Sequence, residues 1–371
     1  MMDVQAQLAE VGAELERAAV EVVRGGAYIM GPEVTRLEAA MAEEAGVRHA
    51  IGVSSGTDAL LVALMALGVG PGDLVLTSTY SFFATAGAVS RLGAWPVLVD
   101  IEPETCNLDP RALEAWFAAH PAERARVRAI IPVHLFGQCA DMAAILRVAR
   151  DHGVAVVEDA AQAIGASCPA GRAGAMGTLG AFSFFPSKNL GAIGDAGLVT
   201  TDDDALAERV RRLRVHGAEP KYHHALVGGN FRLDTIQAAA LLVKLPHLAR
   251  WTEARRERAA YYDAGLASVD AVHPPVPAWG RESHVYNQYV VRVVGDRDRL
   301  AARLAEGGVA TAVFYPVPFH LQECFRALGH ARGDFPHAEA AAASTLALPM
   351  YPQLRPEQQD HVLSLLRRFS R

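Results

Sequence analysis

One lysine, Lys188, stands where a primary amine could do covalent chemistry. It lies in AFSFFPSKNLGAIGDAG (residues 181–197), after an apolar run typical of a strand and before a glycine-rich loop. A loop lysine is usually a solvated surface charge, but Pro186 and Asn189 lie beside this one rather than other charged residues. Glycines also allow the backbone to approach a ligand closely. Lys188 is therefore a candidate for forming a Schiff base.

A carboxylate and an amide follow another apolar run. In VVEDAAQAIGA (residues 156–166), Asp159 ends a predicted strand and Gln162 comes shortly after it. Ligands bind outside the carboxyl ends of strands in open parallel sheets. Taken alone, Asp159 fits the commoner role of a helix N-cap or turn residue better, and Gln162 alone indicates nothing.

A possible anion site lies at the start of a predicted helix. In SSGTDALLVALMAL (residues 54–67), Gly56 and Thr57 open the helical run. Free backbone N–H groups and the helix dipole attract anions at such a place. An ordinary N-cap at Ser55 or Thr57 is the alternative.

Together these three signals fit one cofactor, pyridoxal 5′-phosphate (PLP). PLP needs an amine for a Schiff base, a carboxylate at the pyridine nitrogen and a cradle for its phosphate. A carboxylate within about 4–6 Å favours the protonated ring nitrogen by roughly 1–3 pKa units. A protonated ring is the better electron sink.

The elements that must position these residues alternate between strand and helix. Short runs rich in Val, Ile and Leu predict strands at residues 73–77, 96–100, 129–134, 154–158, 181–185 and 197–200. Helix-compatible stretches at residues 109–119 and 141–152 lie between several of them. Continuous apolar strands separated by helices indicate an α/β fold with a mainly parallel sheet covered on both faces.

The second half of the chain predicts a smaller domain. A long helical region at residues 233–262 contains Pro246, which should break or kink it. A proline-rich connector, HPPVPAWG, precedes a strand at residues 286–294 and helices at residues 297–306 and 356–369. We predict a large PLP-binding domain at residues 1–245 and a small α+β domain at residues 246–371.

Composition excludes several other classes of function. The 371 residues suggest about two domains, and 35 Lys plus Arg against 41 Asp plus Glu argue against nonspecific nucleic-acid binding. The four cysteines show no CxxC spacing and predict neither a zinc site nor a redox pair. We expect a cytoplasmic protein with free thiols, no metal and no membrane segment.

Across nearly its whole length the chain resembles the DegT/DnrJ/EryC1/StrS family of PLP-dependent sugar aminotransferases, which have the aspartate-aminotransferase fold. The resemblance rests on ordered segments that include GPEVTRLEAAMAEEAGVRHAIGVSSGTDAL, IIPVHLFGQCADM, EDAAQAIGA, FSFFPSKNLGAIGDAG, KYHHALVGGNFRLDTIQAAALLVKL, YPVPFH and LALPMYPQL. So many matches in order make chance improbable.

The resemblance implies a role for each matching residue. Lys188 would be the Schiff-base lysine, Asp159 the partner of the pyridinium nitrogen and Gln162 the partner of the ring hydroxyl. The phosphate would be bound by Gly56, Thr57 and Ser183, and by Asn230 from the partner subunit of a homodimer with shared active sites. Phe82 would stack on the ring, although Tyr80 and Phe83 are close by and each could equally be a packing residue.

Candidate substrate contacts are fewer and less specific. They are Lys221, Tyr222 and His223 in KYHH, and Tyr315 and His320 in YPVPFH. Packing or interface closure is the alternative for each. His223 and His224 are adjacent, so on an extended segment they point apart and should not share a metal.

The implied reaction moves an amino group from L-glutamate to a nucleotide-linked keto-sugar, expected to be a dTDP-3-keto-6-deoxyhexose. A 4-keto-sugar nucleotide and an inosose (cyclitol) ketone are the alternative acceptors. A PLP- or PMP-dependent sugar dehydratase is disfavoured, because such relatives carry histidine where this chain has Lys188. A non-catalytic sensor with the same fold is disfavoured by the complete set of Lys188, Asp159 and Gln162.

Overall fold

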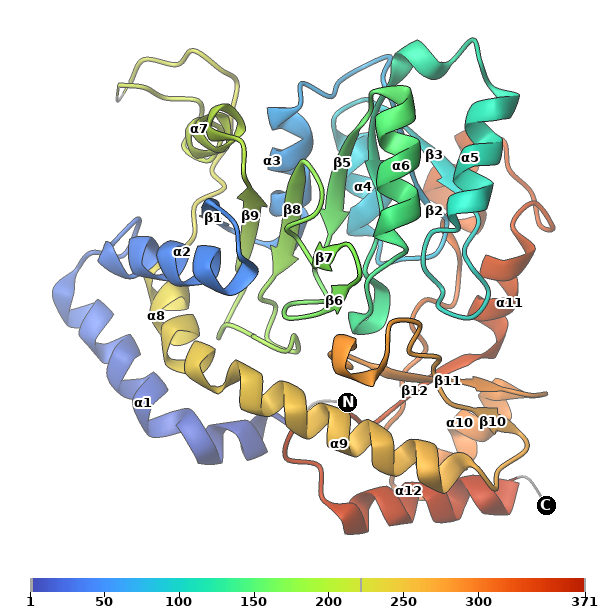
Figure 1. Ribbon diagram of the computed structural model, residues 1–371. Helices are drawn as coiled ribbons and strands as arrows, with labels where there is room; N and C mark the ends of the chain where they lie inside the picture. Colours follow the sequence, from blue (N-terminus) through green and yellow to red (C-terminus); the bar gives the residue numbers. More distant parts are fainter. Residues whose placement is uncertain (1–2, 221, 370–371) are drawn as a thin grey trace.

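A mostly parallel sheet of seven strands forms the centre of the protein (Figure 1). The computed structural model describes residues 3–220 and 222–369. In sheet order the strands are β1 (His49–Val53), β9 (Gly197–Thr201), β8 (Leu179–Ser183), β5 (Ala155–Asp159), β4 (Val127–Ile131), β2 (Leu74–Ser78) and β3 (Trp95–Val99). The five strands from β8 to β3 pair in parallel, and β9 runs antiparallel to both β8 and β1. The predicted α/β fold with a mainly parallel sheet is confirmed.

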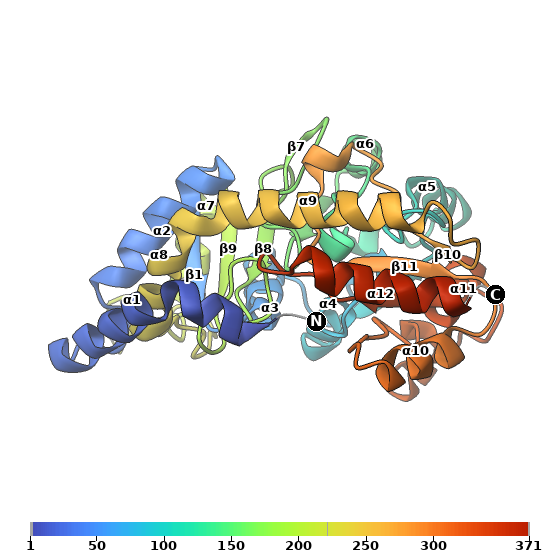
Figure 2. The ribbon, with the colours of Figure 1, turned by 90° about the horizontal axis from the view of Figure 1, so that it is seen from below.

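Helices cover both faces of this sheet, as Figure 2 shows for α5 and α6 on one side and α3 and α4 on the other. The first layer of helices is α3 (Gly56–Ala66), α4 (Ala84–Arg91) and α7 (Asp204–Leu213). The second layer is α2 (Pro32–Ala45), α5 (Pro110–Ala119), α6 (Met142–His152) and α8 (Thr235–Lys244). Because successive strand residues point to opposite faces, Val75 packs with the first layer and Leu74 and Leu76 with the second.

The long helical region predicted for residues 233–262 is broken near Pro246. α8 ends at Lys244, a 3-10 turn η3 (Leu245–His247) contains the proline, and α9 (Leu248–Leu266) follows. α8 packs against α2 and against α1 (Val4–Gly25), whereas α9 packs against α12 (Pro356–Phe369). The packing partners change near residue 245, where we predicted the domain boundary, and that boundary stays a prediction.

A second, antiparallel sheet lies in the C-terminal part of the chain. Its strands are β10 (Val272–His273), β11 (Tyr289–Val293) and β12 (Thr345–Leu348), and its helices are α10 (Arg297–Glu306) and α11 (Pro336–Ser344). The remaining elements are the hairpin β6 (Ser167–Cys168) and β7 (Gly171–Arg172) and the 3-10 turns η1 (Arg124–Arg126), η2 (Leu135–Gly137), η4 (Arg281–Ser283), η5 (Phe319–Leu321) and η6 (Glu323–Leu328).

The described residues contain neither a candidate membrane-spanning helix nor a candidate metal-binding group. None of the helices in residues 3–220 and 222–369 combines the length and apolarity that a membrane crossing requires. Within the same residues, no three His, Cys, Asp or Glu side chains are grouped so that they could hold a metal ion.

Candidate active site

Asp159 lies at the carboxyl end of the central strand β5, where the sequence placed it. Its carboxylate is buried and accepts hydrogen bonds from the Thr85 hydroxyl (2.7 Å) and the Ala161 backbone N–H (3.2 Å). Burial raises the pKa of Asp159, while these two donors and the nearby Lys188 amine oppose the rise. The carboxylate is therefore in a setting where a further cation would stabilise its charged form.

Lys188 lies in the loop that follows β8, and its side chain is half-buried. Burial lowers the pKa of its amine from 10.5 to about 8, and the charge of Asp159 acts in the opposite direction. The structure thus brings Lys188 close to Asp159, although Asp159 ends β5 and Lys188 lies in the loop after β8. An amine with such a pKa is neutral in an appreciable fraction of molecules near neutral pH, as a nucleophile requires.

Gln162 is fixed between two segments that are distant in the sequence. Its Oε1 accepts from the backbone N–H of Phe136 (2.8 Å), and its Nε2 donates to the Tyr315 hydroxyl (2.7 Å). Burial raises the pKa of Tyr315, so the phenol stays protonated and can itself donate to an acceptor. Tyr315, predicted as a substrate contact, therefore lies next to Gln162 at the candidate site.

The three predicted phosphate residues of this chain form one corner. Gly56 is the first residue of α3, and Ser55 caps the helix by accepting from the Asp58 N–H (3.1 Å). A Cβ at Gly56 would come within 2.5 Å of Ser183 Cβ, so only glycine lets the helix start lie this close to the end of β8. Thr57 follows in the same first turn, where N–H groups lack intrahelical acceptors. This corner fits an anion such as a phosphate.

The three neighbouring aromatic residues differ in their contacts. Tyr80 is fully buried, with its hydroxyl bonded to the Phe314 carbonyl, and Phe83 stacks on Phe325 with ring centroids 5.5 Å apart. Phe82 is 55% exposed and lies 6.3 Å from the Tyr315 ring, measured between centroids. The geometry therefore favours Phe82 over its neighbours for stacking on a planar ligand.

Comparison with known proteins identifies the family. Residues 9–367 match the DegT/DnrJ/EryC1/StrS aminotransferase family. The chain belongs to this family. Its aminotransferase activity depends on PLP, which the amine, the buried carboxylate and the anion corner fit. When bound, PLP draws electrons from the carbon that carries the amino group.

Several relatives resemble this aminotransferase along its whole length. A pleiotropic regulatory protein of Geobacillus stearothermophilus is 49% identical over 100% of this chain and 98% of its own. The UDP-2-acetamido-2-deoxy-3-oxo-D-glucuronate aminotransferase of Pseudomonas aeruginosa is 44% identical over 95% of each chain. The crystal structure of S. venezuelae DesV in complex with a ketimine intermediate is 41% identical, with a TM-score of 0.93 over 99% of this chain and 97% of that one.

Two of the predicted substrate contacts, Tyr222 and His223, and the predicted phosphate residue Asn230 lie on the surface of the aminotransferase. Tyr222 and His223 are exposed in a segment that projects beside α7 (Figure 1), and Asn230 is exposed where its backbone pairs with Val215. Lys221 lies outside the described residues. The roles of Lys221, Tyr222, His223 and Asn230 stay predictions, and that of Asn230 depends on a partner subunit.

His320, predicted as a substrate contact, is held by two other side chains. The ring is buried, its Nδ1 lies 3.0 Å from Thr79 Oγ1, and its Nε2 lies 3.0 Å from Glu339 Oε1. Both ring nitrogens are therefore engaged by protein side chains, and the predicted contact of His320 with substrate stays a prediction.

Sequence analysis missed the residues that hold Asp159 and its strand in place. Thr85 donates its only hydroxyl hydrogen to Asp159, so it accepts from Ser81 Oγ (2.9 Å). The hydroxyl residues Ser81 and Thr85 are uncharged and stand in no recognisable motif. Only the fold brings α4, which carries Thr85, to the end of β5.

A second network surrounds Glu158, the residue before Asp159 on β5. Glu158 accepts from the backbone N–H groups of Gly174, Met176 and Gly177 and pairs with His134 (2.8 Å). His134 Nδ1 accepts from the Ala140 N–H, so its Nε2 is the protonated nitrogen that donates to Glu158.

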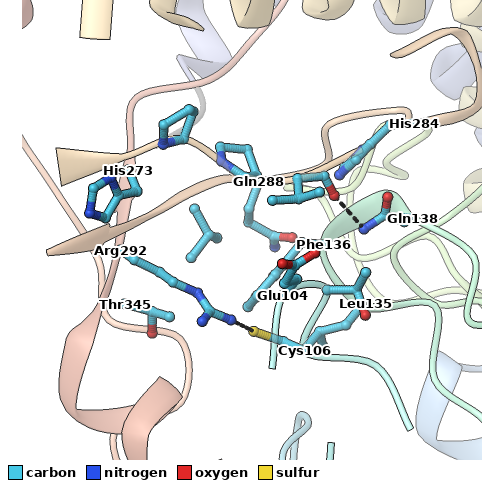
Figure 3. Close-up of a pocket in the computed structure, with 15 residues that line it drawn as sticks. Glu104, Cys106, Leu135, Phe136, Gln138, His273, His284, Gln288, Arg292 and Thr345 are labelled. Atoms are coloured by element: carbon cyan, nitrogen blue, oxygen red, sulfur yellow. Dashed lines mark hydrogen bonds between the residues drawn. The ribbon is translucent and has the colours of Figure 1, made fainter. Parts of the chain in front are cut away.

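A cavity of about 120 Å³ opens next to the site, between the η2 turn and the small sheet (Figure 3). Arg292 from β11 points into it and donates to Cys106 Sγ (3.4 Å). Phe136 forms part of its wall, while the Phe136 backbone holds Gln162 on the other side. None of the predicted site residues lines this cavity, so we assign the chemistry to the strand ends and not to it.

We expect Thr85→Val to lower kcat without unfolding the protein. Valine keeps the shape but removes the hydroxyl that bonds the buried carboxylate, a loss of about 1–3 kcal/mol and thus roughly 5- to 150-fold in kcat. Ser81→Ala is the matched control, because Ser81 touches only Thr85 in this chain of bonds. Equal effects of the two variants on steady-state kcat would show that contact with Asp159 is not what matters.

Proposed function

We propose that this aminotransferase moves an amino group from L-glutamate to C3 of a nucleotide-linked keto-sugar, specifically a dTDP-3-keto-6-deoxyhexose. The observation that carries the catalytic part is the convergence of Lys188, Asp159 and Gln162 beside the Gly56 corner. These residues come from separate segments, and each is held by contacts that suit its proposed role.

In this proposal Lys188 would hold the cofactor covalently, and its amine, once freed by the amino donor, would take up the proton of the donor's α-carbon. Asp159 pairs with the pyridinium nitrogen, and Gln162 bonds the ring hydroxyl. Phe82 stacks on the ring. The phosphate is bound by Gly56, Thr57 and Ser183, and by Asn230 of a second copy of the chain in a homodimer.

The choice of sugar rests on the KYHHALVGGNFRLD segment and on the relatives. This segment resembles family members that aminate C3, and the relative from P. aeruginosa is named for a 3-oxo sugar. Lys221 would supply a cation for the diphosphate, and Tyr222 and His223 would contact hydroxyls or the base. Anchoring the nucleotide decides which ring carbon reaches the cofactor. The sugar in the name of that relative is linked to UDP, so the identity of the nucleotide must be tested together with the carbon that is aminated.

A regulatory role is the competing proposal, because the relative from G. stearothermophilus is named as a regulatory protein. A sensor would not need a lysine with a pKa of about 8 next to a buried carboxylate. Catalysis in the cytoplasm by a homodimer remains our proposal, and sedimentation that finds only monomers under assay conditions would contradict the shared site.

The deciding experiment offers the purified protein L-glutamate and matched acceptors. These are the 3-keto and 4-keto forms of a dTDP-6-deoxyhexose, a UDP-linked 3-keto sugar and a free inosose. We expect turnover of the dTDP-3-keto sugar, with the new amine located at C3 by NMR. Preferential amination of the 4-keto, UDP-linked or cyclitol compound would replace the substrate assignment. Turnover of none of them, with Lys188 and the cofactor intact, would favour the regulatory role.

A further inference from the structure

Lys244, at the end of α8, is a buried cation outside the group of residues discussed so far. The whole chain contains only three lysines, Lys188, Lys221 and Lys244, although Lys plus Arg number 35. Lys244 is 4% exposed, and among residues 3–220 and 222–369 no carboxylate forms an ion pair with it. Burial lowers its pKa to about 8. Keeping an unpaired ammonium in such a place is costly unless a specific contact offsets the cost.

That contact is a hydrogen bond from Lys244 Nζ to the carbonyl of Gly191 (2.7 Å). Gly191 belongs to the loop of residues 186–192, which carries Lys188. A Cβ at Gly191 would lie 2.4 Å from the Pro186 carbonyl oxygen, so the loop closes tightly on itself at this point. A side chain from another segment that binds the Gly191 carbonyl can therefore hold the loop of residues 186–192 in position.

This loop is also held by the burial of Leu190 and Ala192 in the hydrophobic core and by four further hydrogen bonds in or next to it. Its own backbone supplies Lys188 N–H to the Phe185 carbonyl (2.8 Å) and Ala192 N–H to the Phe184 carbonyl (2.7 Å). From other segments, Val285 accepts from Asn189 Nδ2 (2.9 Å), and Gln237 on α8 accepts from the N–H of Ile193 (3.0 Å), just after the loop. Lys244 adds a charge-assisted bond, the strongest class of these contacts.

We propose that Lys244 is a positioning residue that fixes the loop of residues 186–192 and thereby aims the Lys188 amine at the site. This inference rests on the proposed role of Lys188 as the cofactor lysine. A displacement of about 1 Å at a reacting group can cost on the order of 100-fold in rate. Loss of the Gly191 contact should thus affect chemistry more than substrate binding.

The first test measures hydrogen exchange in the cofactor-free protein. Lys244→Met keeps the length of the side chain but removes the donor, and Lys244→Arg keeps both charge and donor. We expect Lys244→Met to speed amide exchange in the peptide that covers residues 186–192 by about tenfold or more, as for loss of a hydrogen bond to a charged donor. Val11→Ala is the control, because it weakens the packing of α1 on Ala240 of α8 and Trp251 of α9 without removing a contact of the loop.

The second test measures kcat, KM and the pH at which the absorbance of the lysine-bound cofactor changes. We expect Lys244→Met to lower kcat at nearly unchanged KM and to shift that pH, with Lys244→Arg recovering most of both. Val11→Ala should lower thermal stability only. If Lys244→Met behaves like Val11→Ala in exchange, kcat and absorbance, the proposal is wrong. Exchange and absorbance need no sugar substrate, so they decide the point even if the proposed acceptor proves incorrect.

Discussion

Lys188→Ala is expected to abolish amino transfer and to remove the visible absorbance of the lysine-bound cofactor, while the protein stays folded. The side chain is half-buried and forms no part of the hydrophobic clusters, so its truncation should have little effect on folding. Lys244 cannot replace it, because Lys244 Nζ is bound to the Gly191 carbonyl. Steady-state turnover and an absorbance spectrum of the purified variant are the measurements.

Borohydride reduction provides the control for this prediction. Reduction should fix the cofactor to one lysine, and peptide mapping has only three candidates in this chain. We expect the label on Lys188 in the wild-type protein and no label in Lys188→Ala. A label on Lys221 or Lys244 would overturn the assignment.

The pH dependence of cofactor capture follows from the same residue. Only the neutral amine attacks a carbonyl, and burial lowers the pKa of Lys188 from 10.5 to about 8. The rate at which cofactor-free protein takes up PLP should therefore rise with pH and level off above about pH 8. A rate that continues to rise towards pH 10.5 would mean that the amine is solvated.

The elements of the large domain were accessible from sequence because buried parallel strands read as continuous apolar runs. Six strands were placed in this way, but β1 was not predicted. HAIGV becomes a strand by pairing antiparallel with β9, a partner far along the chain. The helix break at Pro246 was predictable, because proline removes a local donor whatever the tertiary context.

A site residue could be predicted from sequence only where its residue type has few common structural roles at that position. Lys188, Asp159 and Gln162 stand in ordered motifs, and the structure brings them together. Thr85 and Lys244 have no such motif, since their importance comes from which carboxylate or carbonyl the fold brings within reach. His320 shows the other side of this limit, because the sequence does not reveal that Thr79 and Glu339 bind both nitrogens of its ring.

Asp159→Asn is expected to lower kcat by about 100- to 1000-fold, the loss of about 2.7–4 kcal/mol found for a well-placed electrostatic group. Asparagine keeps the shape, and its single oxygen can accept from Thr85 or Ala161 but not from both, as the carboxylate does. What it loses is the charge that favours a protonated ring nitrogen. Because Asp159 also raises the pKa of Lys188, the variant should capture PLP with a midpoint below about pH 8. Thr85→Val, which weakens the same carboxylate without removing its charge, should give a smaller loss of kcat. A near-normal kcat in Asp159→Asn, measured with saturating cofactor and unchanged thermal stability, would show that the ring nitrogen does not need this carboxylate.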